Sequence, residues 1–138
     1  MPKDTKDTDT VAKIVLIDEK GRVLMLKRAM HLKKYPEKWD LPGGHLKTNE
    51  SPIEGLRREV KEETDLDIRD PVLIEITKER KNKQLKETYF YMGKYDSQKI
   101  KLSDEHIAYS FIDKKVLKKR DKYQKMAIKA LGMHYDKY

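Results

Sequence analysis

The chain contains no cysteine among its 138 residues, so disulfide bonds and zinc sites built from thiolates are excluded. Long apolar runs are also missing. No stretch approaches the length that crosses a bilayer, and the first ten residues, MPKDTKDTDT, lack the apolar core of a signal peptide. The spacings of zinc fingers and the aromatic-interleaved signatures of RNA-binding modules do not occur either. These absences predict a cytoplasmic protein.

Charge is the strongest compositional feature that is present. Charged residues make up 41% of the chain and the formal net charge is +8 at pH 7, while 37% hydrophobic residues suffice for one core in a single domain over residues 1–138. The first nine residues are polar and are expected to be a disordered tail. Lysine and arginine gather in residues 80–86 and 114–125. Such surfaces favour anionic partners, nucleotides or RNA, although most lysine-rich segments are only solvated surface.

One segment, residues 44–66 (GHLKTNESPIEGLRREVKEETDL), carries most of the local information. Ser51 suits the N-cap of a helix, Pro52 suits its first turn, and Glu54 completes a capping box with the serine. This start sets the phase of the helix. The residues predicted to pack inward are Ile53, Leu56 and Val60.

Three glutamates occupy a different face of the same predicted helix. Glu59, Glu62 and Glu63 stand at i, i+3 and i+4, where like charges repel by a few tenths of a kcal/mol per pair. A divalent cation would remove that repulsion, and carboxylate oxygens are ligands that magnesium prefers. The alternative is an ordinary acidic surface of a solvated helix.

The residues just before this segment favour the metal site over the acidic surface. They read Trp-Asp-Leu-Pro-Gly-Gly over residues 39–44, and a glycine pair after an apolar strand end allows the backbone to come close to a ligand. A plain tight turn is the alternative here.

Together these residues resemble the signature of the Nudix hydrolase family. The matching positions are Gly44, Glu50, Arg58, Glu59, Val60, Glu62, Glu63 and Leu66. One position departs, because Asp65 stands where the family pattern has its last glycine. Since aspartate tolerates the left-handed backbone that ends many helices, we expect a positive φ at Asp65, at a cost of about 1 kcal/mol relative to glycine.

The resemblance implies an α+β fold, an α/β/α sandwich in which a mixed sheet lies between the signature helix and a C-terminal helix. Pattern alone predicts a hairpin of two strands joined at residues 18–21, a polar loop over residues 31–38, and an amphipathic helix from about Lys114 to His134. The remaining strands are expected at residues 72–77, 87–95 and 107–112, with a turn at 81–83 between the first two.

For activity, the resemblance implies metal-dependent hydrolysis of a nucleoside diphosphate linked to another group, with Mg²⁺ or Mn²⁺ as cofactor. The implied metal ligands are Glu59, Glu62 and Glu63, with the carbonyl oxygen of Gly43 as an addition. Arg58 is expected to hold the site's geometry, either through Glu62 one turn on or through the loop carboxylate of Glu50.

The general base is open between two glutamates. Glu59 serves if its carboxylate reaches the attacking water, and Glu105 serves if the loop of residues 103–106 lies against the site, where it could also bind metal. An ordinary solvated loop acid is an equally supported interpretation of Glu105.

The substrate is the least determined part. Arg28 resembles a family arginine that faces the phosphates of the substrate. His45 directly follows the glycine turn. Aromatic side chains could stack against a base. The substrate-binding candidates are Arg28, Trp39, Gly44, His45 and Tyr89. A MutT-like nucleoside triphosphate pyrophosphohydrolase is the leading hypothesis. The alternatives are hydrolysis of ADP-ribose, dinucleoside polyphosphates or RNA 5′-ends, or a non-catalytic nucleotide- or RNA-binding module, and RNA and a second copy of the chain are partners left open.

Overall fold

The computed structural model describes residues 8–32, 38–96, 99–118 and 121–137, with side chains up to residue 133. Its elements, in chain order, are β1 (Thr8–Leu16), β2 (Val23–Arg28), β3 (Trp39–Asp40), β4 (Gly43–His45), α1 (Pro52–Thr64), β5 (Ile68–Lys81), β6 (Gln84–Tyr95), β7 (His106–Ile112), the short 3₁₀ helix η1 (Lys114–Val116) and α2 (Lys122–Lys137). Neither helix, as far as it is described, has the length and apolarity needed to cross a membrane.

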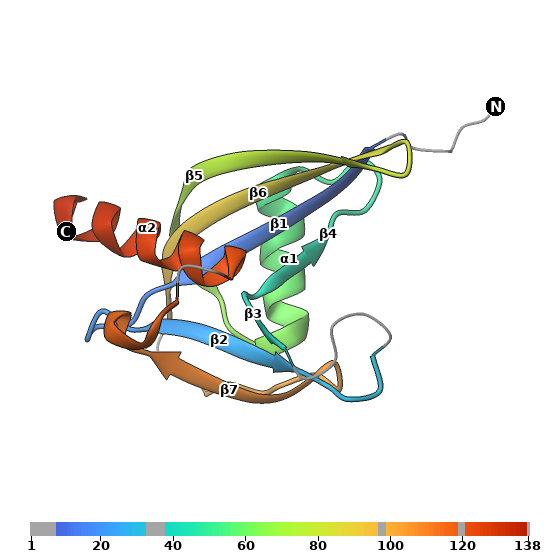
Figure 1. The fold of residues 1–138 in the computed structure, drawn as a ribbon. Helices are drawn as coiled ribbons and strands as arrows, with labels where there is room; N and C mark the ends of the chain where they lie inside the picture. Colours follow the sequence, from blue (N-terminus) through green and yellow to red (C-terminus); the bar gives the residue numbers. More distant parts are fainter. Residues whose placement is uncertain (1–7, 33–37, 97–98, 119–120, 138) are drawn as a thin grey trace.

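The described strands form two sheets. The larger has the order β4-β1-β6-β5 and the smaller has the order β3-β2-β7. Strands β1 and β6 run parallel and the other pairs antiparallel, so the larger sheet is mixed, as expected. Figure 1 shows the larger sheet above the smaller one.

The prediction that the first two strands pair with each other as a hairpin is wrong. Among the described residues a single bridge, Ile17 to Val23, links them, and each strand then enters a different sheet. The physical reason lies in their composition. Both strands are buried along a run of residues that is apolar except for Lys13, so each can serve as a central strand with neighbours on both sides.

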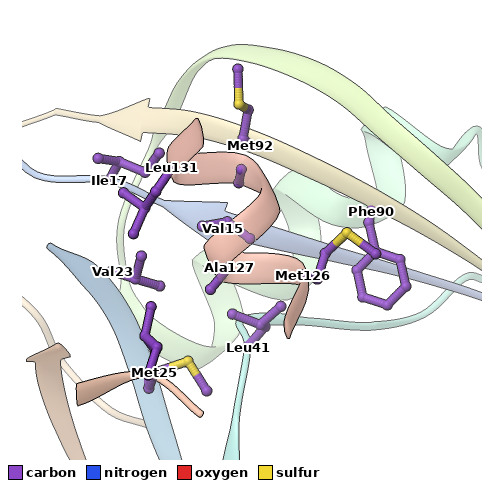
Figure 2. Close-up of a cluster of buried hydrophobic side chains, with 12 residues drawn as sticks. Val15, Ile17, Val23, Met25, Leu41, Phe90, Met92, Met126, Ala127 and Leu131 are labelled. Atoms are coloured by element: carbon purple, nitrogen blue, oxygen red, sulfur yellow. The ribbon is translucent and has the colours of Figure 1, made fainter. Parts of the chain in front are cut away.

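Two helices cover the sheets from opposite sides, which confirms the sandwich. Helix α2 packs Met126, Ala127 and Leu131 on side chains of β1, β2 and β6, and Figure 2 shows these residues in one cluster with Val15 and Met25. Helix α1 packs Leu56 and Val60 on the other cluster. Its partners there include Ala12, Ile14, Leu16, Leu24 and Leu26. The helix that carries the glutamates is thus anchored to β1 by apolar contacts.

Strands β5 and β6 form a hairpin that is longer than predicted at both ends. The turn falls at Asn82 and Lys83, as expected, and both have positive φ, of 51° and 65°. The extra strand residues are mostly polar and pair across the two strands, for example Lys78 with Glu87 at 3.5 Å. Hydrophobic alternation cannot detect a strand segment whose pairs are charged.

Two boundary predictions also change. Thr8 and Asp9, expected in the disordered tail, pair with β6 as part of β1, whereas residues 1–7 lie outside the described chain. Five residues of the predicted polar loop, 33–37, lie outside it as well. The single C-terminal helix is in fact η1 followed by α2, because Asp113 and Asp121 each cap a separate start.

Candidate active site

Helix α1 begins as predicted. The Ser51 hydroxyl accepts from the Glu54 backbone at 3.2 Å, and the Glu54 carboxylate accepts from the Ser51 backbone at 2.9 Å, which confirms the capping box. Leu56 and Val60 are fully buried, so the helix has the predicted phase. At its end Asp65 has φ 65° and ψ 17°, which confirms the left-handed stop.

Arg58 ties the glutamates of the site together. Its Nε donates to Glu50 at 2.7 Å, and its Nη1 donates to Glu59 at 2.8 Å and to Glu62 at 3.1 Å. Both expected partners, Glu50 and Glu62, are therefore used at once. The guanidinium lowers the pKa of Glu50 to about 2, while the hydrogen bond that Glu50 accepts raises the pKa of Arg58.

Glu63 is held in a different way, by burial. Only 5% of this residue is exposed, and its Oε1 accepts the backbone N–H of Gly43 at 2.8 Å. Burial raises the pKa of Glu63 to about 8, against the opposing charge of Lys13. No hydrogen bond reaches its other oxygen from the described residues, so that oxygen can serve a ligand.

The two glycines of the turn allow close approaches to two different partners. Gly43 has φ 126°, and a Cβ there would lie 2.1 Å from the backbone oxygen of Ala12. A Cβ on Gly44 would lie 2.2 Å from the Glu59 carboxylate oxygen Oε2. The first glycine thus joins β4 to β1, and the second makes room for a carboxylate of the site.

The donor atoms at this edge fit a divalent cation in their chemistry. They are carboxylate oxygens of Glu59, Glu62 and Glu63 and the carbonyl oxygen of Gly43, the hard ligands that Mg²⁺ takes. No three histidine, aspartate or glutamate side chains in the described chain already converge as a finished cage. Glu59 and Glu62 each accept a hydrogen bond from Arg58, which holds both carboxylates beside the cleft.

The floor of the site contains an ion pair that the sequence analysis did not identify. The Lys13 ammonium donates to Asp40 at 3.0 Å and to the carbonyl oxygens of Leu41 at 3.1 Å and Gly43 at 3.3 Å. Arg28 lies 3.5 Å from the same aspartate. The one available signal was Lys13 itself, a lone charge inside the apolar run of residues 11–17. These hydrogen bonds hold Lys13 against the glycine turn.

Glu105 reaches the site through the end of β2. Its carbonyl oxygen accepts the backbone N–H of Ala29 at 2.8 Å, which fixes the loop beside the strand that carries Arg28. The next residue, His106, is buried, and neither of its ring nitrogens has a hydrogen-bond partner among the described residues. Burial lowers the pKa of His106 to about 4, so the ring is neutral at physiological pH.

A cleft of about 1200 Å³ brings most of the predicted site residues together. Nine of them line it: Arg28, Trp39, Gly43, Gly44, His45, Glu59, Glu62, Glu63 and Glu105. Arg58 does not line the cleft and instead holds Glu59 and Glu62 through the contacts above. His45 points its Nδ1 at Asp9, 2.9 Å away.

Tyr89 is not brought to this cleft. It packs with the α1 cluster and lines a separate hollow of about 590 Å³. The next residue of β6, Phe90, faces the buried cluster that contains the apolar side chains of α2. The pleat of β6 therefore places the two rings on opposite faces of the sheet. The aromatic ring that does join Trp39 in the cleft is Tyr123 of α2, which also packs against the buried cluster under that helix.

Comparison with known proteins agrees with the geometry. The model of the NUDIX domain matches residues 7–129. Among solved structures, the MutT protein from Methanosarcina mazei Go1 has a TM-score of 0.76 at 26% identity, covering 98% of this chain and 100% of that one. No curated protein sequence matches at a significant level.

Two further solved structures share the fold at lower identity. A MutT NUDIX hydrolase from Burkholderia pseudomallei has a TM-score of 0.74 at 19% identity, covering 88% of this chain and 96% of its own. An Ap4A hydrolase from C. elegans has a TM-score of 0.73 at 17% identity, covering 94% and 99%.

Proposed function

The chain belongs to the NUDIX family of hydrolases, and from that premise we propose that it cleaves nucleoside triphosphates to a nucleoside monophosphate and pyrophosphate. One observation carries the proposal. The three glutamates of α1 and Glu105 line one cleft together with Arg28 and two aromatic rings, Trp39 and Tyr123. This places acidic, basic and stacking groups within reach of a single nucleotide.

Divalent metal dependence is part of the proposal. Glu59, Glu62 and Glu63 would hold Mg²⁺ or Mn²⁺, with the Gly43 carbonyl and Glu105 as additional ligands. The bound cation supplies positive charge that offsets the charge developing on the diphosphate as its bridge breaks.

The chain's own groups have distinct tasks in this reaction. The oxygen of a water molecule bonds to phosphorus, the bridging P–O bond breaks, and the leaving phosphate chain takes the electron pair. Glu105 or Glu59 accepts the proton of that water. Arg58 keeps the α1 carboxylates in position, Arg28 faces the phosphates, and Trp39 offers a ring against which a base can stack.

A substrate panel tests the proposal. Nucleoside triphosphates, ADP-ribose, dinucleoside polyphosphates, nucleotide sugars and capped RNA are incubated with Mg²⁺ and, separately, with Mn²⁺, and the products are identified. We expect pyrophosphate and a nucleoside monophosphate from triphosphates. Products only from another class would move the protein to that class, and no turnover of any member would contradict the proposal.

Matched variants tie the activity to the site. Glu62→Gln and Glu63→Gln are expected to lower kcat/KM by about 100-fold or more, because each replaces a carboxylate oxygen that would bind the cation. Glu19→Gln, on an exposed turn away from the cleft, is the control for charge loss.

Glu105→Gln decides between the two bases. A change within about twofold, or roughly 0.4 kcal/mol, would exclude Glu105 and leave Glu59.

A further inference from the structure

The cleft continues past the reaction centre toward the turn of the β5–β6 hairpin. Helix α2 covers only one part of this face of the larger sheet, as Figure 1 shows, and it begins at Lys122. Beyond that residue the lining consists of polar side chains from the hairpin. We call this part of the cleft the basic end, formed by Lys81, Lys86 and Lys122, with Asn82 and Gln84 beside them.

The two acids beside Lys86 already have partners, and one of these partners belongs to the basic end itself. Lys86 of β6 stands in register with Asp9 of β1 and Glu79 of β5, so the three side chains share one face of the sheet. Asp9 bonds to His45 at 2.9 Å, and Glu79 pairs with Lys122 at 3.6 Å.

Lys86 makes no ion pair within the part of the chain that the structure describes. It is half-buried, and its burial together with the charge of Lys122 lowers its pKa. Two ammonium groups therefore lie close enough to disfavour each other inside one cleft. A bound anion would relieve that repulsion, just as a cation relieves the repulsion among the α1 glutamates.

The basic end is separate from the reaction centre but lies in the same cleft. Strand β6 is two strands away from β4, about 10 Å across the sheet. Along the strands, Val11 is level with both His45 and Thr88, and Lys86 lies two residues beyond Thr88. An anion bound there would belong to the substrate without being the group that is cleaved.

The N-terminus of α2 does not itself supply the binding site. Asp121 caps that helix by accepting from the backbone of Tyr123 at 2.8 Å and of Gln124 at 3.2 Å. Recognition of an anion at this end therefore depends on the lysine side chains.

We propose that Lys86 and Lys122 form an anion subsite for the phosphate groups that extend beyond the diphosphate being cleaved. The subsite selects nucleotides by the length of their phosphate chain, so affinity increases from nucleoside diphosphate to triphosphate to tetraphosphate. This inference rests on the proposed function. It adds a reason why a chain of three or more phosphates is the preferred substrate.

Steady-state kinetics with the three chain lengths on one nucleoside test the selection. Lys86→Gln, Lys122→Gln and the double variant are compared with Lys125→Gln, which removes the same charge from an exposed site on α2 outside the cleft. We expect the double variant to raise KM about tenfold for the triphosphate and tetraphosphate, with kcat unchanged. KM for the diphosphate should stay within about twofold. Equal changes for all three substrates, or none, would overturn the subsite.

A binding measurement separates this inference from the proposed function. Inorganic tripolyphosphate and orthophosphate are titrated calorimetrically into the metal-free protein. We expect tripolyphosphate to bind more tightly than orthophosphate, with affinity about tenfold lower in the double variant and unchanged in Lys125→Gln. If the protein hydrolyses no nucleotide but shows this pattern, the subsite stands and the proposed hydrolysis fails. If it hydrolyses triphosphates but the double variant binds tripolyphosphate as tightly as wild type, the hydrolysis stands and the subsite is wrong.

Discussion

The two ends of the cleft are built in contrasting ways. The acidic wall, formed by Glu59, Glu62 and Glu63, comes from five consecutive residues of one capped helix. The basic end comes from a hairpin and from the start of α2, far apart in the chain. The wall is a product of local structure, whereas the basic end exists only because the sheet and α2 are assembled.

The ends also differ in how tightly their side chains are held. Each carboxylate of the wall has a fixed partner, either Arg58 or the backbone of Gly43. At the basic end the ion pair of Lys122 with Glu79 spans 3.6 Å and involves exposed side chains. A preorganised wall suits chemistry that needs fixed geometry, and a loosely held end suits recognition of a flexible phosphate chain. Substitutions should therefore alter turnover at one end and selectivity at the other.

The strongest test of the preorganised wall is Gly44→Ala. The added methyl group would lie 2.2 Å from the Glu59 oxygen and must displace that carboxylate. We expect kcat/KM to fall about 100-fold, since a misplacement of about 1 Å can cost that much, while the protein still folds. Gly132→Ala is the matched control, because nothing lies within 4 Å of a Cβ there. Activity close to wild type in Gly44→Ala would show that the wall tolerates movement.

Arg58→Lys tests whether the wall needs a forked cation or only a positive charge. An ammonium cannot reproduce the simultaneous contacts with Glu50, Glu59 and Glu62. We expect about a tenfold loss of kcat/KM, measured beside thermal unfolding to confirm that the variant is folded. Full activity with lysine would mean that charge alone suffices.

The acid sensitivity of the wall's support is tested with Glu50→Gln. Arg58 holds the pKa of Glu50 at about 2, below its ordinary value of 4.5. A lowered carboxyl pKa contributes stability that is present above pH 4.5 and is lost as the pH falls toward 2. Denaturant unfolding at pH 7, 5 and 3 should show wild type more stable than Glu50→Gln at neutral pH, with the difference shrinking at pH 3. A difference independent of pH would assign the effect to packing.

Asp65→Gly tests whether the left-handed end of α1 affects only stability or also the activity of the acidic wall. With φ at 65°, glycine removes the strain of an L side chain, and we expect a gain of about 1 kcal/mol in the free energy of unfolding. The exposed Lys61–Asp65 pair at 3.5 Å offsets little of this gain. Turnover should not change. Loss of activity in Asp65→Gly would show that the stop also positions the glutamates.

The smallest expected effect is on stability at the basic end. Lys86→Gln removes a half-buried charge that is repelled by Lys122, so the free energy of unfolding should stay constant or rise by a few tenths of a kcal/mol. Lys125→Gln gives the reference for an ordinary exposed lysine. Destabilisation by more than about 1 kcal/mol would mean that Lys86 supports the hairpin, and the contrast between the ends would then fail.

The parts of the site that the sequence predicts correctly are those whose structure depends on residues close together in the chain. Ser51, Pro52 and Glu54 start the helix, and the spacing of Glu59, Glu62 and Glu63 then follows from 3.6 residues per turn. The left-handed stop at Asp65 follows from the same local geometry. The Lys13–Asp40 pair was missed because its members are 27 residues apart and meet only when β1 and the strand before the glycine turn are assembled.

The sequence by itself determined the capped helix, its face of carboxylates and the glycine turn that leads into it, because backbone geometry within a few residues decides each of them. The tertiary structure alone decided that β1 and β2 enter separate sheets, that Tyr123 and not Tyr89 lines the cleft, and that Lys86 and Lys122 line it together. Strand pairing and helix docking join segments tens of residues apart, and no local preference specifies which of them become neighbours.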